Sequence, residues 1–158
     1  MRYNALMWSP SRIVLVAVSP AAIWVAACAS GSSSTAGGAS ELAGTSWQLV
    51  RFQGNDDTSL TPNDGAKYTL SFGADGRVIA RIDCNRGNGT WTSDGSGQVR
   101  FGPLALTRAM CPPGSLHDRI VRDWEYFRTY LLQDGHLFLD LMADGGTYEF
   151  EPASAASD

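Results

Sequence analysis

The sequence predicts a mainly β domain of the α+β class, a small antiparallel β-barrel or curled sheet with one packed α-helix. Between residues 41 and 152, several short segments carry an apolar residue at every second position, and turn-forming residues separate them. Alternation with period two buries one face of a strand and leaves the other face in water. Residues 115–132 instead place apolar residues three and four positions apart, which is the period of a helix.

The predicted strands are short runs with apolar side chains in phase, as in Trp47 and Leu49 of the first run. They lie at residues 46–52, 67–72, 76–82, 98–101, 136–142 and 147–150. The pair Asp75-Gly76 separates the second and third runs, and Asp-Gly between alternating runs is a strong signal for a β-hairpin. A second Asp-Gly pair at Asp144-Gly145 predicts a turn between the last two strands.

The helical pattern in residues 115–132 predicts one amphipathic helix that packs on the sheet. Its apolar stripe consists of Leu116, Ile120, Trp124, Phe127 and Leu131. Ser115 and Asp118 stand three positions apart at its start, which is the spacing of a capping box. Gly135 is expected to end the helix.

The first 27 residues have the features of a secretory signal peptide. Arg2 and Arg12 come before an apolar run at residues 13–27, which would span only about 22 Å as a helix, less than a bilayer core. The run ends in Val25-Ala26-Ala27-Cys28, which resembles the lipobox of bacterial lipoproteins, where a diacylglycerol is attached to the cysteine. We therefore expect Cys28 to hold the chain on the membrane, although an ordinary signal peptide without lipidation stays the alternative.

The segments on either side of the domain are predicted to lack structure. After Cys28, residues 29–40 contain only Ala, Ser, Gly and Thr, a composition typical of a flexible tether. Residues 153–158 are a similar short tail. Residues 28–40 would therefore link the domain to the cell envelope, on its periplasmic or other extracytoplasmic face.

Charge argues against nucleic acid as a partner. The chain has 12 Lys and Arg and 16 Asp and Glu. Loss of Arg2 and Arg12 with the leader leaves 10 basic residues, so the mature net charge is 10 − 16 = −6. An acidic domain is repelled by phosphate backbones and by anionic lipid.

Cys84 and Cys111 remain in the mature domain, and in an exported protein such a pair usually forms a disulfide. A bond across these 27 residues would stabilise the fold by about 3–4 kcal/mol. A metal site would need three or four ligands with a close cysteine pair, and the sequence has no such pair. Two packed thiols are the remaining alternative.

Three segments in register resemble the META-domain family, whose members include HslJ-like heat-shock lipoproteins. They are Leu42 to Trp47, Cys84-Asn85-Arg86 followed by Gly89 and Trp91, and Leu104 to Cys111. The resemblance covers residues 41–151 and implies a small β-barrel with one helix, as in secretion pilotin lipoproteins. It also implies a role in envelope or heat stress and in antibiotic tolerance. The chain has Asp83 where the family commonly has Gly, and Trp91 where Tyr is common.

The run after Cys84 predicts a turn. Asn85 and Gly87 tolerate positive φ, so the chain is expected to reverse there and to direct Cys84 toward Cys111. Asn85 and Arg86 are also candidate residues for binding a polar group at the barrel rim. A purely structural role for both residues is the alternative.

The sequence contains no recognisable catalytic motif. His117 lies among charged residues at the predicted helix start, and His136 begins a strand, so both are expected on the surface. G-x-S-x-G, H-E-x-x-H and P-loop patterns do not occur. We therefore expect neither an enzyme nor a cofactor or metal site.

Three functions are compatible with these observations. The first is a monomeric envelope lipoprotein that binds or scaffolds an envelope protein. The second is a carrier or pilotin-like chaperone that holds an apolar ligand or a partner's helix inside its barrel, which would require an internal cavity of a few hundred Å³. The third is an enzyme whose catalytic residues are dispersed along the chain.

Overall fold

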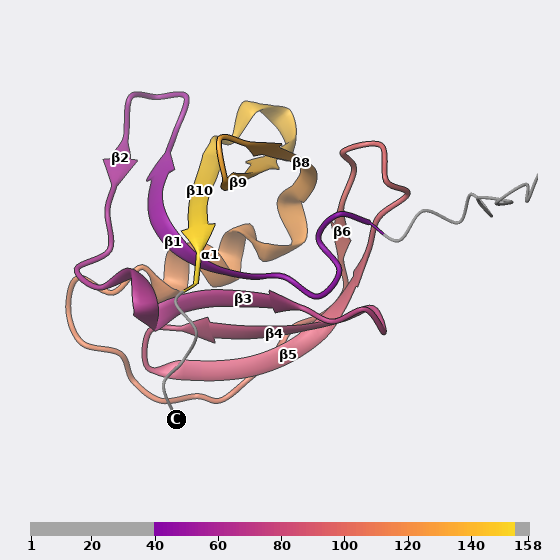
Figure 1. Cartoon of the computed structure of the whole chain (residues 1–158). Coiled ribbons are helices and arrows are strands. Elements are labelled where there is room, and N and C mark those ends of the chain that lie inside the picture. Colours follow the sequence, from indigo (N-terminus) through magenta and orange to yellow (C-terminus); the bar gives the residue numbers. More distant parts are fainter. Residues whose placement is uncertain (1–39, 154–158) are drawn as a thin grey trace, which may run out of the picture. The chain divides into compact units, whose positions relative to one another are not determined.

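The computed structural model describes residues 40–153 (Figure 1). In this part of the chain no helix combines the length and hydrophobicity needed to cross a membrane. The predicted signal peptide, Cys28 and nearly all of the tether and the tail lie outside the described residues.

The domain is an antiparallel β-barrel, which confirms the predicted fold class. Neighbouring strands follow the order β6-β5-β4-β3-β1-β10-β9-β8, and each pair is antiparallel. The strands are β1 (Ser46–Gln53), β3 (Tyr68–Phe72), β4 (Arg77–Ile82), β5 (Asn85–Thr92), β6 (Arg100–Phe101), β8 (Phe127–Gln133), β9 (His136–Leu141) and β10 (Thr147–Pro152). Two short strands lie off this path: β2 (Ser59–Leu60) pairs with β1, and β7 (Ala105–Leu106) pairs with β5.

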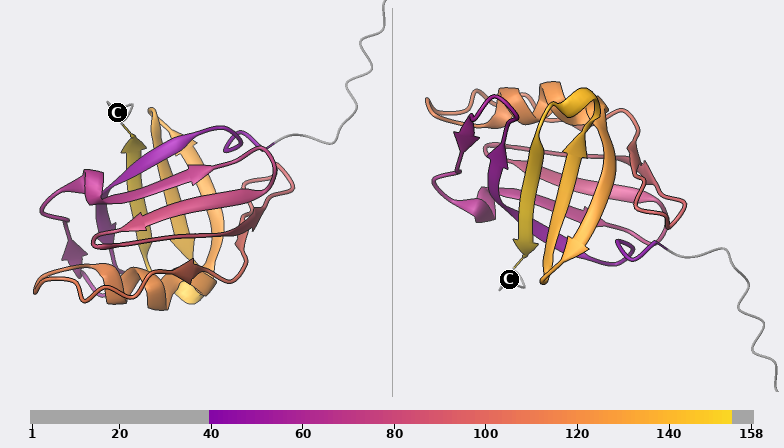
Figure 2. Two further views of the ribbon diagram at one scale, coloured as in Figure 1. Left: turned by 90° about the horizontal axis from the view of Figure 1, so that it is seen from below. Right: turned by 90° about the horizontal axis from the view of Figure 1, so that it is seen from above.

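The first and last strands of this order meet and nearly close the barrel. Gln98 forms a β-bridge with Thr129, just before β6 begins. The N–H of Val99 donates to the carbonyl of Arg128 at 2.9 Å, and the N–H of Tyr130 donates to the carbonyl of Gly97 at 2.7 Å. Closure of this kind removes most of the exposed strand edge. Figure 2 shows the strands wrapped around a common interior.

Side chains fill the interior of the barrel. The predicted inward residues of the strands are buried apart from Phe101, which is partly buried, and a bulge after Leu49 turns Phe52 inward as well. The largest fully buried side chains are Tyr148, Phe52, Phe72, Phe127, Leu42, Leu49, Ile82, Leu137, Leu139, Val78, Val99 and Asn85. The cavity among Tyr68, Trp124 and Phe150 measures about 10 Å³, which is at most the space of a single water.

Helical structure is limited to short segments. The α-helix α1 (His117–Asp123) continues into the 3₁₀ turn η2 (Trp124–Tyr126), and two further 3₁₀ turns are η1 (Gly65–Lys67) and η3 (Met142–Asp144). The predicted helix over residues 115–132 is therefore wrong in its second half, because residues 127–133 form strand β8. Leu131, expected in the buried stripe, is 51% exposed.

The turn at Asp134-Gly135 explains this difference. Asp134 has φ 53° and Gly135 has φ 81°, and two consecutive positive φ values are what a two-residue hairpin turn requires. Gly135 therefore joins β8 to β9 and ends no helix. Phe127 and Tyr130 fit both a helical stripe and a strand with a bulge after its first residue, so the apolar pattern alone did not decide between them.

The start of the helix also differs from the prediction. Leu116 is the N-cap residue and makes no side-chain capping bond, so the predicted box of Ser115 and Asp118 is absent. Ser115 instead accepts a hydrogen bond from the N–H of His117 at 3.1 Å. The predicted packing of the helix is confirmed, because Ile120 and Trp124 are buried in the core.

Different segments close the two ends of the barrel. At the end that we call the helix end, α1 lies beside Phe52 and Tyr148, and the Trp124 ring donates to the carbonyl of Gly102 at 3.0 Å. The opposite, N-terminal end is filled by Leu42, which is fully buried. Ser40, assigned to the tether from its composition, is 8% exposed and lies 3.3 Å from the Tyr130 hydroxyl, so the folded part includes it.

Candidate functional site

The predicted disulfide is present and fastens a surface segment to the helix end of the barrel. Cys84 and Cys111 are bonded, with their Cα atoms 5.4 Å apart. Cys84 lies in the turn between β4 and β5, whereas Cys111 lies on the segment that leads toward α1. The alternative of two packed thiols is therefore excluded.

The prediction of a turn at Asn85 and Gly87 is wrong. The turn consists of Asp83 and Cys84 alone, and β5 starts at Asn85, directly opposite Ile82 of β4. Asp83 has the positive φ of this turn, 55°, which accounts for the glycine that is common at this position in the family. Gly87 instead allows the backbone of β5 to lie close to the backbone of Ala105. A Cβ at position 87 would collide with the carbonyl of Ala105.

Asn85 is a buried structural residue. Its side chain is fully buried, its Nδ2 donates to the carbonyl of Ala109 at 2.9 Å, and its Oδ1 accepts from the N–H of Ala109 at 2.7 Å. The hydroxyl of Thr107 donates to the same Oδ1 at 2.9 Å. Asn85 also lines a surface groove, and its predicted role in binding a polar group at the rim stays a prediction. Arg86, the other candidate, is exposed; its N–H donates to the Thr107 hydroxyl at 3.1 Å, and its carbonyl accepts from the N–H of Thr107 at 2.9 Å.

The segment that Asn85 holds forms one wall of a groove of about 730 Å³, which we call the loop groove. Residues 104–110 line one side, and His117 and Val121 of α1 line another. Met110 is 98% exposed and Val121 is 37% exposed, so apolar side chains face water there. The volume falls within the range of natural ligand sites, and the exposed apolar groups favour a binding role.

The two histidines lie on different elements, and each contacts one carboxylate. His117, expected in water, has a side chain only 20% exposed, and its Nδ1 lies 2.9 Å from Oδ1 of Asp118. Its Nε2 is buried without a partner among residues 40–153. Nδ1 of His136 lies 2.9 Å from Oε1 of Glu149, on the wall of the barrel. No group of three or more His, Cys, Asp or Glu side chains that could hold a metal occurs in the described part.

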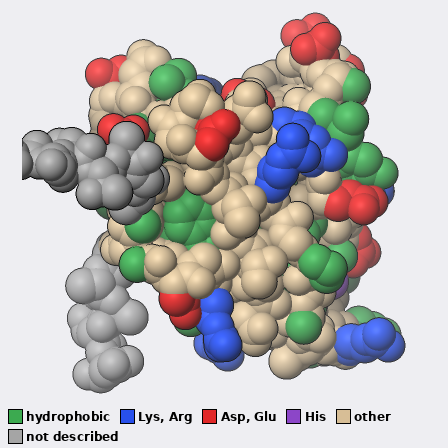
Figure 3. Space-filling model, turned by 90° about the vertical axis from the view of Figure 1, so that its right-hand side faces the viewer, with side chains coloured by type: hydrophobic (Ala, Val, Ile, Leu, Met, Phe, Trp, Pro, Cys, Tyr) green, Lys and Arg blue, Asp and Glu red, His purple; other side chains and the backbone are tan. Residues whose placement is uncertain are grey.

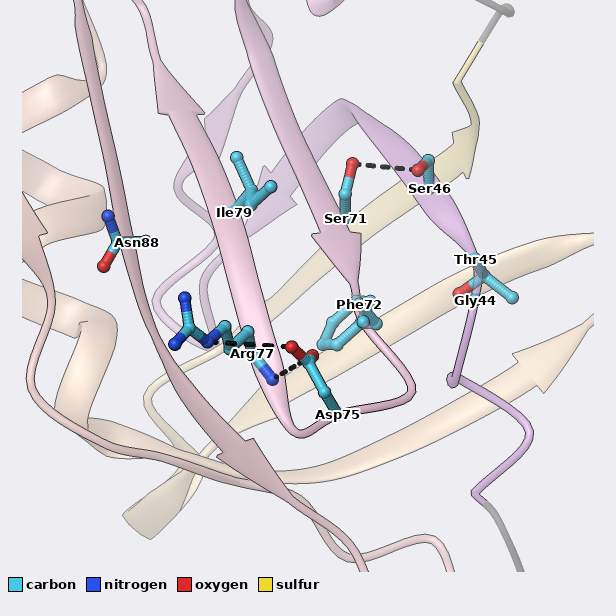
Figure 4. A pocket seen from close by; sticks show the side chains of 10 residues that line it. Gly44, Thr45, Ser46, Ser71, Phe72, Asp75, Arg77, Ile79 and Asn88 are labelled. Atoms are coloured by element: carbon cyan, nitrogen blue, oxygen red, sulfur yellow. Dashed lines mark hydrogen bonds and ion pairs between the residues drawn. The ribbon is translucent and has the colours of Figure 1, made fainter.

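A second hollow, which we call the sheet-face pocket, lies on the outer face of β3, β4 and β5 and measures about 440 Å³ (Figure 4). Ser71, Ile79 and Asn88 are direct neighbours across these strands. The hydroxyl of Ser46 donates to that of Ser71 at 2.8 Å, and Asp75 forms a 3.6 Å ion pair with Arg77. Because these polar groups bond to one another, the pocket offers a ligand fewer free partners than the loop groove.

A buried polar network at the helix end was missed from the sequence. The hydroxyl of Tyr148 donates to Oδ2 of Asp123 at 2.7 Å, and Nε of Arg119 donates to the same oxygen at 2.6 Å. Burial, together with the neighbouring carboxylate of Asp123, strongly raises the pKa of Tyr148. The Arg119 guanidinium also lies 4.1 Å from the ring centre of Phe52. The network links α1 to β10 of the barrel through Asp123 and Tyr148.

One face of the domain carries charges of both signs. On the face shown in Figure 3, basic and acidic side chains are interspersed and no large field of one sign is seen.

Solved structures share this fold. An NMR structure of a protein from Burkholderia xenovorans is 25% identical over 72% of this chain and 85% of its own, with a TM-score of 0.61. A DUF4847 family protein from Bacteroides vulgatus is 17% identical over 73% of this chain and 96% of its own, with a TM-score of 0.53. No curated protein matches the chain. The sequence model of the META domain matches residues 40–155, and the chain therefore belongs to the META-domain family.

Proposed function

We propose that this protein is an extracytoplasmic lipoprotein, anchored through Cys28, that binds a protein partner at the loop groove and catalyses no reaction. The proposal includes a role in the response of the envelope to heat or other stress and in antibiotic tolerance, which rests on the family resemblance. The lipobox-like ending of the leader supports the anchor. The observation that carries the binding role is the loop groove itself, with Met110 98% exposed beside it.

The filled interior argues against the carrier function. A carrier of the kind considered would need a few hundred Å³ inside its barrel. The internal cavity among the described residues measures about 10 Å³, and aromatic side chains such as Phe72 and Phe127 occupy the centre. Binding at an external groove needs no rearrangement of this core.

The described part of the chain offers little support for an enzyme. General acid–base catalysis needs titratable groups that converge on one substrate position. His117 and His136 lie on different elements, and each contacts one carboxylate. The Tyr148 network is closed to substrate by Phe52 and α1.

Site-specific crosslinking in living cells tests the binding role. A photoreactive amino acid at position 110 of the full chain should yield a crosslinked protein on irradiation. The matched control carries the same amino acid at position 79, where Ile79 is 63% exposed in the sheet-face pocket. A product seen at position 110 and absent at position 79 supports the groove, whereas no product at 110 contradicts it.

A further inference from the structure

We infer that the loop groove takes an extended acidic peptide segment, which adds as a β-strand to the free edge of residues 104–110. This inference rests on the proposed binding role of the groove and names the chemistry of the partner. It follows from the hydrogen bonds of that segment, from the groove beside it and from the charges on its rim.

The backbone of the segment uses only one of its two edges. The N–H of Thr107 donates to the carbonyl of Arg86 at 2.9 Å, and the N–H of Ala109 donates to Asn85 at 2.7 Å. Successive N–H groups of an extended chain point to opposite edges. The polar backbone groups of Leu106, Arg108 and Met110 therefore point away from β5.

The free edge borders the groove. Residues 104–110 line it together with His117 and Val121 of α1, so an added strand would lie between the edge and the helix. Unpaired edges are templates for another strand, and domains that bind by strand addition combine such an edge with a side-chain groove. The apolar surface of Val121 and Met110 is placed to receive alternate side chains of the peptide.

The charges on the rim favour an acidic partner. Arg108 lines the groove, is exposed and belongs to no ion pair within residues 40–153. A carboxylate of a bound peptide would pair with Arg108 in the groove.

The same charges disfavour a second copy of this chain as the occupant. Symmetric antiparallel pairing of two such edges about Arg108 would place the two Arg108 side chains opposite each other. A heterologous acidic segment avoids this repulsion and keeps the same backbone bonds.

A peptide titration tests the inference on the full, isotope-labelled chain in detergent. The probe is an acetylated, amidated peptide with four Glu-Val repeats, and we expect it to shift the amide signals of Leu106, Arg108 and Met110. A Lys-Val peptide of equal length should bind at least about tenfold more weakly, as should a Glu-Val peptide with N-methyl groups on its pairing edge.

Charge reversal provides a matched pair of variants. Arg108→Glu should reverse the preference toward the Lys-Val peptide, whereas Arg100→Glu, on β6 and outside the loop groove, should leave the preference unchanged.

Equal binding of the N-methylated peptide would overturn strand addition. Absence of any shift with the Glu-Val peptide, beside a crosslink at position 110, would overturn the acidic partner and leave the binding role intact. Absence of both the amide shifts and the crosslink at position 110 would overturn the acidic partner and the binding role together.

Discussion

Asn85 shows how one buried amide organises a surface segment. Its side chain forms two hydrogen bonds with the backbone of Ala109 and accepts one from the hydroxyl of Thr107. The residue type indicated a turn from sequence, because Asn is common in turns. Its actual role depends on a backbone 24 positions away, which no local pattern contains.

We predict that Asn85→Ala lowers the free energy of unfolding by about 2–4 kcal/mol, since three hydrogen bonds are lost from a buried site. Chemical denaturation measures this loss. The control is Asn88→Ala on the outer face of the same strand, which should change stability by less than about 0.5 kcal/mol. Equal effects of the two substitutions would mean that Asn85 does not hold the segment.

The raised pKa of Tyr148 predicts that the free energy of unfolding depends on pH in the alkaline range. Its pKa is raised in the folded protein, so above about pH 10 the unfolded chain loses this proton while the folded one keeps it. The free energy of unfolding should therefore fall as pH rises above 10, by up to about 1.4 kcal/mol per pH unit from this group. The contribution is fully present below that pH.

Tyr148→Phe should remove this part of the slope between pH 10 and 11.5, as measured by urea unfolding at each pH. It should also cost about 0.5–1.5 kcal/mol at neutral pH, because the bond to Asp123 is lost. Tyr126→Phe, at a position 41% exposed, is the control and should keep the wild-type slope. An unchanged slope in Tyr148→Phe would contradict the assignment.

At the scale of single elements, β8 is the segment whose state the sequence did not determine. Its apolar residues fit a helix and a bulged strand, and pairing with β9 through Asp134-Gly135 favours the strand. Asp134-Gly135 is a hairpin signal, but a glycine after an apolar stripe with helical spacing also predicts the end of a helix. In contrast, β3 and β4 were predicted correctly, because alternation and turn chemistry agree there.

Two substitutions in β8 distinguish a strand from a helix. Leu131→Thr should cost less than about 1 kcal/mol, because Leu131 is half exposed and Thr suits a strand. Tyr130→Thr should cost about 3–4 kcal/mol, because Tyr130 is 6% exposed and the change empties core volume. Thermal or chemical denaturation would show the reverse order if residues 127–133 continued the helix.

The disulfide links the turn between β4 and β5 to the segment that leads toward α1. Replacing both Cys84 and Cys111 with Ser should lower the free energy of unfolding by about 3–4 kcal/mol under oxidising conditions, since the bond closes 27 residues. In reductant the wild type should fall to the value of the variant. A variant that stays less stable than the reduced wild type would show that the sulfurs contribute by packing.

At the scale of the whole molecule, different segments close the two ends of the barrel. The chain enters the domain at Ser40, where Leu42 closes the N-terminal end, whereas the disulfide and α1 lie at the helix end. The core between the two ends is filled.

We predict that Cys28→Ala releases the protein from membranes, because the lipid on this cysteine is the proposed anchor. Cell fractionation and detergent phase partitioning measure the release. The double replacement of Cys84 and Cys111 is the control, and it should stay in the membrane fraction. A Cys28→Ala protein that still partitions with detergent would contradict the anchor.

The sequence by itself determined most strands, the Asp75-Gly76 hairpin, the pairing of Cys84 with Cys111 and the packing of Ile120 and Trp124 on the sheet. These features follow from period-two and helical patterns, from turn chemistry and from the small number of cysteines, all of which are local or compositional. Only the tertiary structure decided that residues 127–133 are a strand, that the barrel closes between Gln98 and Thr129, and that Asp123 meets Tyr148. The physical reason is that strand closure and buried polar pairs depend on which distant groups meet once the core has formed.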